Sequence, residues 1–172
     1  MVKVLISVAS AEEQQKGIFM TVDYDNHKFA VSLNNKYMQQ MNLSIACCGL
    51  TNEPPYTGVI IVDDNWLACN EEMKSFFIFH EIGHFVNGDL TFNMEHAIDN
   101  IHHRESGNTV CDSMEFAADK FSVETISMLE NIPDFNKYVA NVFIELGNNL
   151  ILSGSTANGN EIIRRANYLK SL

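Results

Sequence analysis

The chain has 172 residues, of which 46% are apolar, and its formal net charge at pH 7 is −11. A chain of this size and apolar content can bury a substantial core, and no linker divides it, so we expect a single domain over residues 1–172. The acidic excess argues against a nucleic-acid partner, and no apolar run approaches the roughly twenty residues of a membrane-spanning helix, so we expect no membrane insertion.

The four cysteines show no disulfide-like spacing, since Cys47 and Cys48 are adjacent and the sequence contains no C-x-x-C. Free thiols in a reducing compartment are therefore expected, which indicates a cytoplasmic protein. Residues 1–11 contain a lysine, a short apolar run and an A-x-A ending, but this stretch is shorter than a usual signal peptide. Its β-branched residues predict a strand over Val2–Val8 instead.

The first third of the chain is predicted to form a sheet. Residues 17–24 and 28–33 bracket Asp25-Asn26, a pair typical of a hairpin turn. A β-branched run over 57–62 indicates a further strand. Two segments lie between these strands: a short predicted helix over Asn34–Met41, and an unassigned stretch over Leu43–Leu50.

The rest of the chain is predicted to be helical. A first helix begins after Asn70, a suitable N-cap, and ends at Asn87-Gly88. The polar segment 89–108 follows it and is a candidate lid. The later elements are a helix over 109–131, a helix over 134–152, a flexible connector over 153–160 and a tail helix over 161–172. The predicted fold class is α+β, with a small sheet over residues 1–62 packed on a helical core over 70–152.

Residues 80–84, within the first long helix, read H-E-x-x-H. On a helix His80 and His84 lie one turn apart on the same face, so both imidazoles can reach one tetrahedral metal ion. Glu81 projects beside them and is placed to take a proton from a water molecule at that ion. The alternative interpretation is that both histidines are ordinary core residues.

A catalytic zinc site needs a third protein ligand from elsewhere in the chain. Glu115 and Asp119 share a face of the next predicted helix, where one carboxylate could bind the metal and the other could accept the free ring N–H of a ligating histidine. The small pair Ala117-Ala118 would let this helix approach the first closely. Alternatively, Glu115 closes a D-x-x-E capping box that begins at Asp112. The other candidate ligands are Cys111, His96, His102 and His103.

Two segments carry a family resemblance: residues 80–89, H-E-I-G-H-F-V-N-G-D, and residues 115–119, E-F-A-A-D. Together they resemble the catalytic core of the HtpX/Ste24-type zinc peptidases, which pair H-E-x-x-H-x-x-N with E-x-x-A-D. They are also similar to the ImmA/IrrE group of small soluble peptidases. Both groups are gluzincins, whose third zinc ligand is a glutamate from a later helix. The resemblance implies zinc ligands His80, His84 and Glu115, with Glu81 as the base and Asp119 as the partner of His80.

The chain departs from this family pattern in two ways. HtpX/Ste24-type enzymes are commonly embedded in membranes, whereas this sequence has no spanning segment. Gluzincins also tend to carry a downstream His, Tyr or Arg that stabilises the tetrahedral intermediate, and no histidine follows His103. The candidates for that role are Tyr138, Arg164, Arg165 and Tyr168.

The family pattern also suggests where a substrate would bind. Gluzincins commonly receive an extended substrate at a sheet edge beside the motif helix, so Gly58–Val62 could form the wall of the cleft. Alternatively, this apolar run is a central, buried strand.

The sequence thus predicts a soluble zinc-dependent endopeptidase that binds one Zn²⁺ per chain and cleaves protein or peptide substrates, with Glu81 as general base. Two other hypotheses stay open. One is a catalytically silent zinc-binding regulatory or adaptor protein with the same fold. The other is an interaction domain without metal, in which the motif is accidental. The sequence does not predict the oligomeric state.

Overall fold

The computed structural model describes residues 3–90 and 109–172, without the side chains of 109–111. The chain divides into two compact units, residues 1–81 and residues 82–172, and the division falls inside helix α4 (Glu71–Val86). The single domain expected from the sequence therefore stays a prediction. From residue 91 onward the candidate lid lies outside the described residues.

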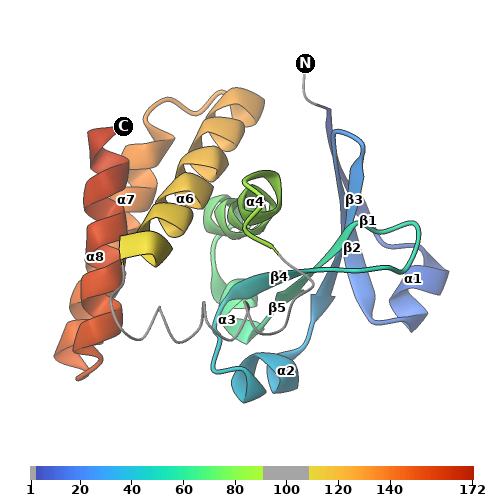
Figure 1. Cartoon of the computed structure of the whole chain (residues 1–172), viewed down its shortest axis with the longest axis horizontal. Helices are drawn as coiled ribbons and strands as arrows, with labels where there is room; N and C mark the ends of the chain where they lie inside the picture. Colours follow the sequence, from blue (N-terminus) through green and yellow to red (C-terminus); the bar gives the residue numbers. More distant parts are fainter. Residues whose placement is uncertain (1–2, 91–108) are drawn as a thin grey trace. The chain divides into compact units, whose positions relative to one another are not determined.

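The first unit is built on a five-stranded mixed sheet with the strand order β1-β2-β3-β5-β4 (Figure 1). The pairs β1–β2, β2–β3 and β4–β5 are antiparallel, and β3–β5 is parallel. The strands are β1 (Val4–Val8), β2 (Ile18–Tyr24), β3 (His27–Leu33), β4 (Ala46–Leu50) and β5 (Gly58–Val62). With the long helices that follow, this sheet confirms the predicted α+β class.

The predicted hairpin forms around Asp25-Asn26, where Asp25 adopts a positive φ of 56° that an aspartate tolerates in a turn. The strands on either side supply core residues, since Val22 and Phe29 are fully buried. The short helix predicted over Asn34–Met41 is α2 (Asn35–Gln40), and the Asn34 side chain caps it by accepting the N–H of Tyr37. Two one-turn helices were not predicted: α1 (Ala11–Gln15) and α3 (Asp64–Ala68).

The position of β5 corrects the hypothesis that Gly58–Val62 is a sheet edge. This strand pairs on one side with β3 and on the other with β4, so it is interior, and its residues Ile60 and Val62 are fully buried. The last strand on that side of the described sheet is β4, in the stretch Leu43–Leu50 that the sequence left unassigned. Its residues A-C-C-G-L lack the polar and apolar alternation that marks a half-exposed strand.

Glu13 of α1 is the centre of a polar cluster within the first unit. Its carboxylate accepts the hydroxyl of Tyr56 at 2.7 Å, the backbone N–H of Ser10 at 2.8 Å and the ammonium of Lys28 at 3.3 Å. These bonds favour the charged form of the carboxylate, and that of Tyr56 contributes most, so they lower the pKa of Glu13 from 4.5 to about 2. The bonds therefore stabilise the fold fully above pH 4.5, and this contribution is lost as the pH falls toward 2.

Replacing Tyr56 with phenylalanine is expected to raise the pKa of Glu13 toward its ordinary value, because the strongest donor to the carboxylate is removed. Carboxyl ¹³C shifts of Glu13 followed by NMR during an acid titration measure this change. Tyr37→Phe on α2 is the matched control and should leave Glu13 unaffected. A Glu13 titration curve that is the same in Tyr56→Phe and in the wild type would contradict the prediction.

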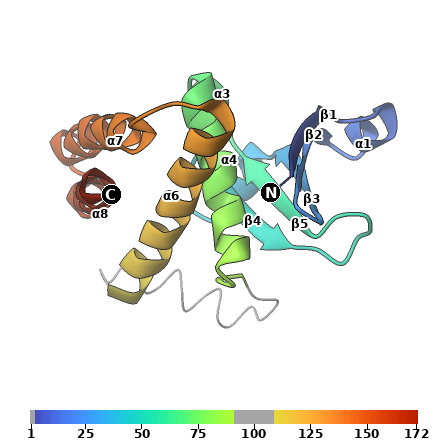
Figure 2. The ribbon, with the colours of Figure 1, turned by 90° about the horizontal axis from the view of Figure 1, so that it is seen from above.

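The second unit contains the end of α4 and three long helices: α6 (Thr109–Glu130), α7 (Phe135–Leu152) and α8 (Thr156–Ser171). The predictions over 109–131 and 134–152 are confirmed as α6 and α7. Helices α7 and α8 run side by side in both views (Figures 1 and 2). Among the helices of the described residues, none combines the length and the hydropathy that a membrane span requires.

The last helix begins earlier than the sequence predicts, at Thr156 rather than Glu161. The predicted connector over 153–160 therefore includes the first turn of α8. Gly159 explains the difference, because its lack of a side chain lets the first turns of α8 pack closely on α7. A Cβ at this position would lie 2.6 Å from the carbonyl oxygen of Gly147 on α7. A stretch of low helix propensity is thus held helical by close packing of two glycines, a long-range contact that local sequence does not reveal.

Candidate metal site

Helix α4 forms as the sequence predicts. The Asn70 side chain accepts the N–H of Met73 at 3.0 Å and so caps the first turn, and Glu71 and Glu72 place negative charge there. Along the helix, His80, Glu81 and His84 are all buried. A buried polar group needs a partner or a ligand, so three such groups within five residues mark this part of α4 as a candidate site.

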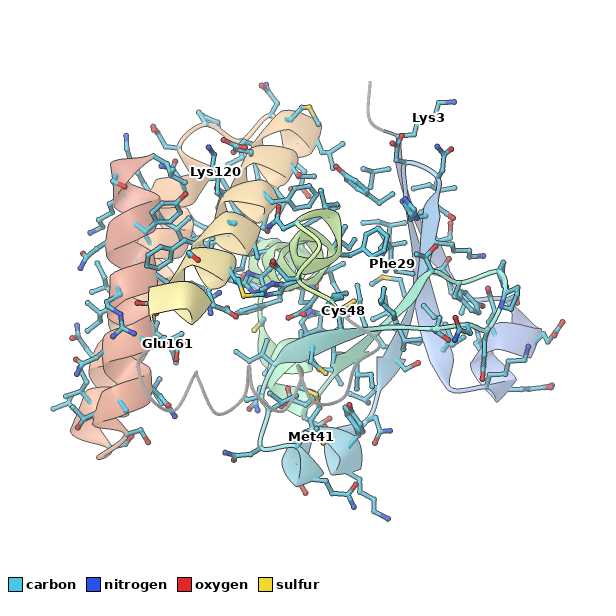
Figure 3. All side chains as sticks on the ribbon, in the orientation of Figure 1. Lys3, Phe29, Met41, Cys48, Lys120 and Glu161 are labelled. Carbon is cyan, nitrogen blue, oxygen red and sulfur yellow. The ribbon has the colours of Figure 1, made fainter. Side chains whose placement is uncertain are left out.

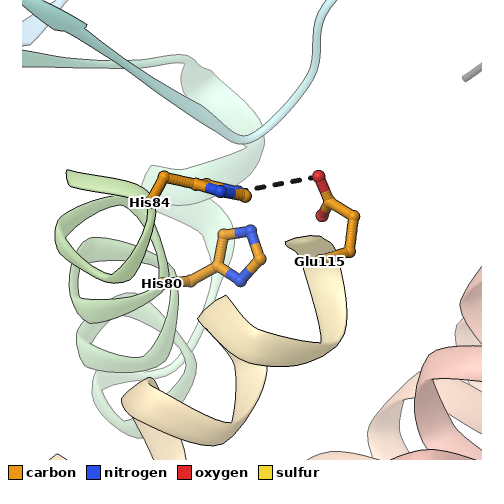
Figure 4. A group of neighbouring side chains, drawn as sticks. All are labelled: His80, His84 and Glu115. Carbon is orange, nitrogen blue, oxygen red and sulfur yellow. Dashed lines mark ion pairs between the residues drawn. The ribbon is translucent and has the colours of Figure 1, made fainter. Parts of the chain in front are cut away.

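The structure brings His80, His84 and Glu115 together (Figure 4). Each offers one ligand atom, and these atoms all lie within 4.8 Å of one another. His84 Nε2 is 3.6 Å from Glu115 Oε1, close to the spacing of about 3.3 Å between two ligands of a tetrahedral zinc ion. Two imidazoles and a carboxylate are also a donor set that zinc accepts. The buried group could therefore hold one metal ion.

Glu115 reaches this position because α6 starts at Thr109, which places Glu115 inside the helix and not at its cap. The capping-box interpretation with Asp112 as N-cap is therefore wrong. The predicted close approach of the two helices is confirmed at Ala118, which is fully buried. A Cβ added to Gly83 of α4 would lie 3.0 Å from the Cα of Ala118, so the backbones of α4 and α6 nearly touch there.

Arg165 of α8 holds two buried carboxylates of α6, those of Asp119 and Glu115. Its Nε and Nη2 donate to the two oxygens of Asp119 at 2.8 and 2.6 Å, and its Nη1 lies 3.0 Å from Glu115 Oε2. Burial alone would lower the pKa of Arg165, but the charges of Asp119 and Glu115 outweigh it and raise that pKa above its usual value. Arg165 is therefore a buried cation that directs Oε1 of Glu115 toward His84 while it occupies Oε2.

Asp119 is fully buried, although it carries a charge in the middle of α6. Its bidentate pair with Arg165 is a contact that the sequence analysis did not anticipate. The role inferred from the family resemblance, in which Asp119 accepts the ring N–H of His80, stays a prediction.

Comparisons with protein-family models, with curated proteins and with solved structures give no match. The resemblance to gluzincins therefore rests on the two motifs and on the donor set alone.

Asp89 is a site residue that sequence reasoning missed. Its Oδ2 lies 2.9 Å from Nδ1 of His84, the ring nitrogen that does not face Glu115. The sequence does contain a local signal for this contact, because Asp89 directly follows the Asn87-Gly88 helix end. A carboxylate is electrostatically unfavourable at the C-terminus of a helix, so its presence there indicates a specific partner.

The other candidates from the sequence lie in different surroundings. Arg164 makes a bidentate pair with Asp112, and Tyr168 stacks on Phe116 with 4.6 Å between ring centroids. Tyr138 stacks against Phe135. The histidines 96, 102 and 103 lie outside the described residues, and so does the side chain of Cys111.

A hollow of about 480 Å³ lies beside α6, and its lining includes Asn87, Phe116, Lys120 and Tyr168. None of the three ligand residues lines it. The hollow is therefore distinct from the candidate metal site.

Cys48 lies on β4 (Figure 3), and its thiol interacts electrostatically with Glu81 of the H-E-x-x-H motif. Burial raises the pKa of the Cys48 thiol well above its ordinary value, and the negative charges of Glu81 and Cys47 add to the effect. Glu81 of α4 and Cys48 of β4 therefore interact electrostatically.

Proposed function

We propose that the protein is a zinc-dependent peptidase of the gluzincin type, with His80, His84 and Glu115 as zinc ligands and Glu81 as general base. The observation that supports this proposal best is the buried group of two histidines and one glutamate around an H-E-x-x-H helix. Three protein ligands and an open position are typical of catalytic zinc, whereas structural zinc usually has four protein ligands.

When bound, zinc supplies a Lewis acid that polarises the scissile carbonyl and makes a water molecule more acidic. Glu81 accepts the proton of the attacking water and then passes it to the leaving amine. Arg165 keeps Glu115 in place through Oε2, and Asp89 keeps His84 in place through Nδ1. The residues of the chain thus fix the ligands, while Glu81 moves the proton.

We further propose that an extended peptide pairs with the outer edge of β4, and not with β5 as the sequence suggested. An outer strand offers unpaired backbone groups to a peptide, which can add to the sheet as a further strand. The electrostatic interaction between Glu81 and Cys48 of β4 supports this placement. Cys48 and Cys69 are free thiols, which supports our proposal of a reducing, cytoplasmic environment.

One observation favours a second candidate, a catalytically silent zinc-binding regulator. Arg165 is a downstream cation beside Glu115, and it is bonded to both Asp119 and Glu115. A guanidinium held in this way is not positioned to stabilise a reaction intermediate. Turnover of a peptide library by the purified protein separates the two candidates, because a regulator binds zinc and cleaves nothing.

We expect one zinc ion per chain, because the three ligand residues converge on one point. Elemental analysis of protein purified without chelators measures the stoichiometry. His80→Ala/His84→Ala should abolish zinc binding, since it leaves one ligand of three. His27, which lies on β3, provides the control, and His27→Ala should keep the zinc. Absence of stoichiometric zinc from the wild type, or its retention in the double variant, would contradict the proposal.

A further inference from the structure

The C-terminal end of α4 forms a Schellman motif around Gly88. The N–H of Gly88 donates to the carbonyl of Phe85 at 3.1 Å, and the N–H of Asp89 donates to the carbonyl of His84 at 2.9 Å. Gly88 has a φ of 76°, the left-handed conformation that this motif requires and that glycine adopts without strain. The chain therefore folds back at Gly88, and this brings Asp89 into contact with His84, which lies about one and a half helical turns before it.

The same fold-back brings the side chains of these two residues together. Oδ2 of Asp89 lies 2.9 Å from Nδ1 of His84, and both side chains are largely buried, with 14% and 9% of their surface exposed. His84 is thus bound twice by Asp89, once through its backbone carbonyl and once through its ring. The other ring nitrogen, Nε2, faces Glu115.

A carboxylate at this place needs a specific compensation. The C-terminal end of a helix carries a partial negative charge, so an aspartate there is electrostatically unfavourable. A hydrogen bond from the Nδ1–H of His84 offsets that cost, because a carboxylate accepts a ring N–H strongly in a buried setting. Such a pairing favours the tautomer of His84 that carries its proton on Nδ1.

We propose that Asp89 is a positioning residue for His84, and that Gly88 places it. Asp89 holds the proton of the neutral imidazole on Nδ1, which leaves the lone pair of Nε2 directed at the metal site. Outer partners of this kind typically strengthen metal binding by about 10–100-fold. The inference rests on the proposed function only in taking His84 as a metal ligand.

Two measurements test the inference. The first is zinc affinity, by competition titration against a chromophoric chelator. Asp89→Ala should weaken it about 10–100-fold. Asp89→Asn should lie between this variant and the wild type, because its amide oxygen can still accept from Nδ1–H. Gly88→Ala should weaken zinc binding in the same direction, because alanine disfavours a φ of 76°. Asp134→Asn, at an exposed aspartate paired with Lys137, is the charge-matched control and should keep wild-type affinity.

The second measurement is the tautomer of His84 in the metal-free protein, read from the ring ¹⁵N shifts at about pH 8, where an ordinary imidazole is neutral. The wild type should carry its proton on Nδ1, and Asp89→Ala should shift it toward Nε2. This result does not require zinc, so it stands even if the wild type binds no metal and the proposed function fails. A wild-type tautomer in Asp89→Ala, or a shifted tautomer with unchanged zinc affinity, would overturn the proposal.

Discussion

Replacing Glu81 with glutamine is expected to abolish peptide hydrolysis while the protein keeps its zinc. The amide has nearly the same shape as the carboxylate, and the side chain is buried, so the packing of α4 is preserved. An amide cannot accept the proton of the attacking water, however. Loss of general-base catalysis alone typically costs about 10²–10⁴-fold in rate.

Turnover of a cleaved peptide, measured together with the zinc content of the same preparation, tests this expectation. Glu72→Gln is the matched control, because it makes the same chemical change at an exposed position of the same helix. The control should have wild-type turnover. If Glu81→Gln loses its zinc, then Glu81 is a ligand or a structural residue, and if it keeps full turnover, Glu81 has no part in the reaction.

Replacing Arg165 with methionine is expected to have the largest effect on stability. The change leaves Asp119 without its bidentate partner and Glu115 without the guanidinium that neutralises it, in a place where both carboxylates are buried. Removal of one partner from a buried ion pair typically costs about 3–5 kcal/mol of unfolding free energy, because a charge is left unpaired out of water. Urea denaturation of the metal-free variant and the metal-free wild type measures the difference.

The neighbouring residue provides an unusually close control. Arg164 also makes a bidentate pair with an aspartate of α6, Asp112, but this pair is substantially exposed. Arg164→Met should therefore cost no more than about 1 kcal/mol. Equal losses of unfolding free energy in the two variants would show that burial of the Arg165 pair does not determine how much it stabilises the fold.

The motif helix was predictable because its signals are local. An asparagine cap, two acidic residues in the first turn and a terminal glycine fix its bounds, and the spacing of His80 and His84 places both rings on one face. The spacing of Glu115 and Asp119 likewise predicted a shared face. The structure brings Glu115 to the two histidines, and it places Asp119 beside Arg165.

What the sequence could not predict depends on distant contacts. Arg165 is 46 residues from Asp119, and no local pattern links them. The unassigned β4 becomes a strand by pairing with β5, and the early start of α8 depends on Gly159 meeting Gly147. In each case the deciding interaction is tertiary, and it overrides the weak preference of the local residues.

The contact between Gly83 and Ala118 has a consequence for anyone who would transplant this centre into a designed protein. Gly83 occupies one of the two variable positions of H-E-x-x-H, yet an alanine there would meet the Cα of Ala118 at 3.0 Å. The second helix would then have to withdraw by a few tenths of an ångström. Glu115 is one turn away on that helix and would withdraw with it. A designer who copies His80, Glu81, His84 and Glu115 must therefore also keep glycine at position 83, because a methyl group there would push α4 and α6 apart.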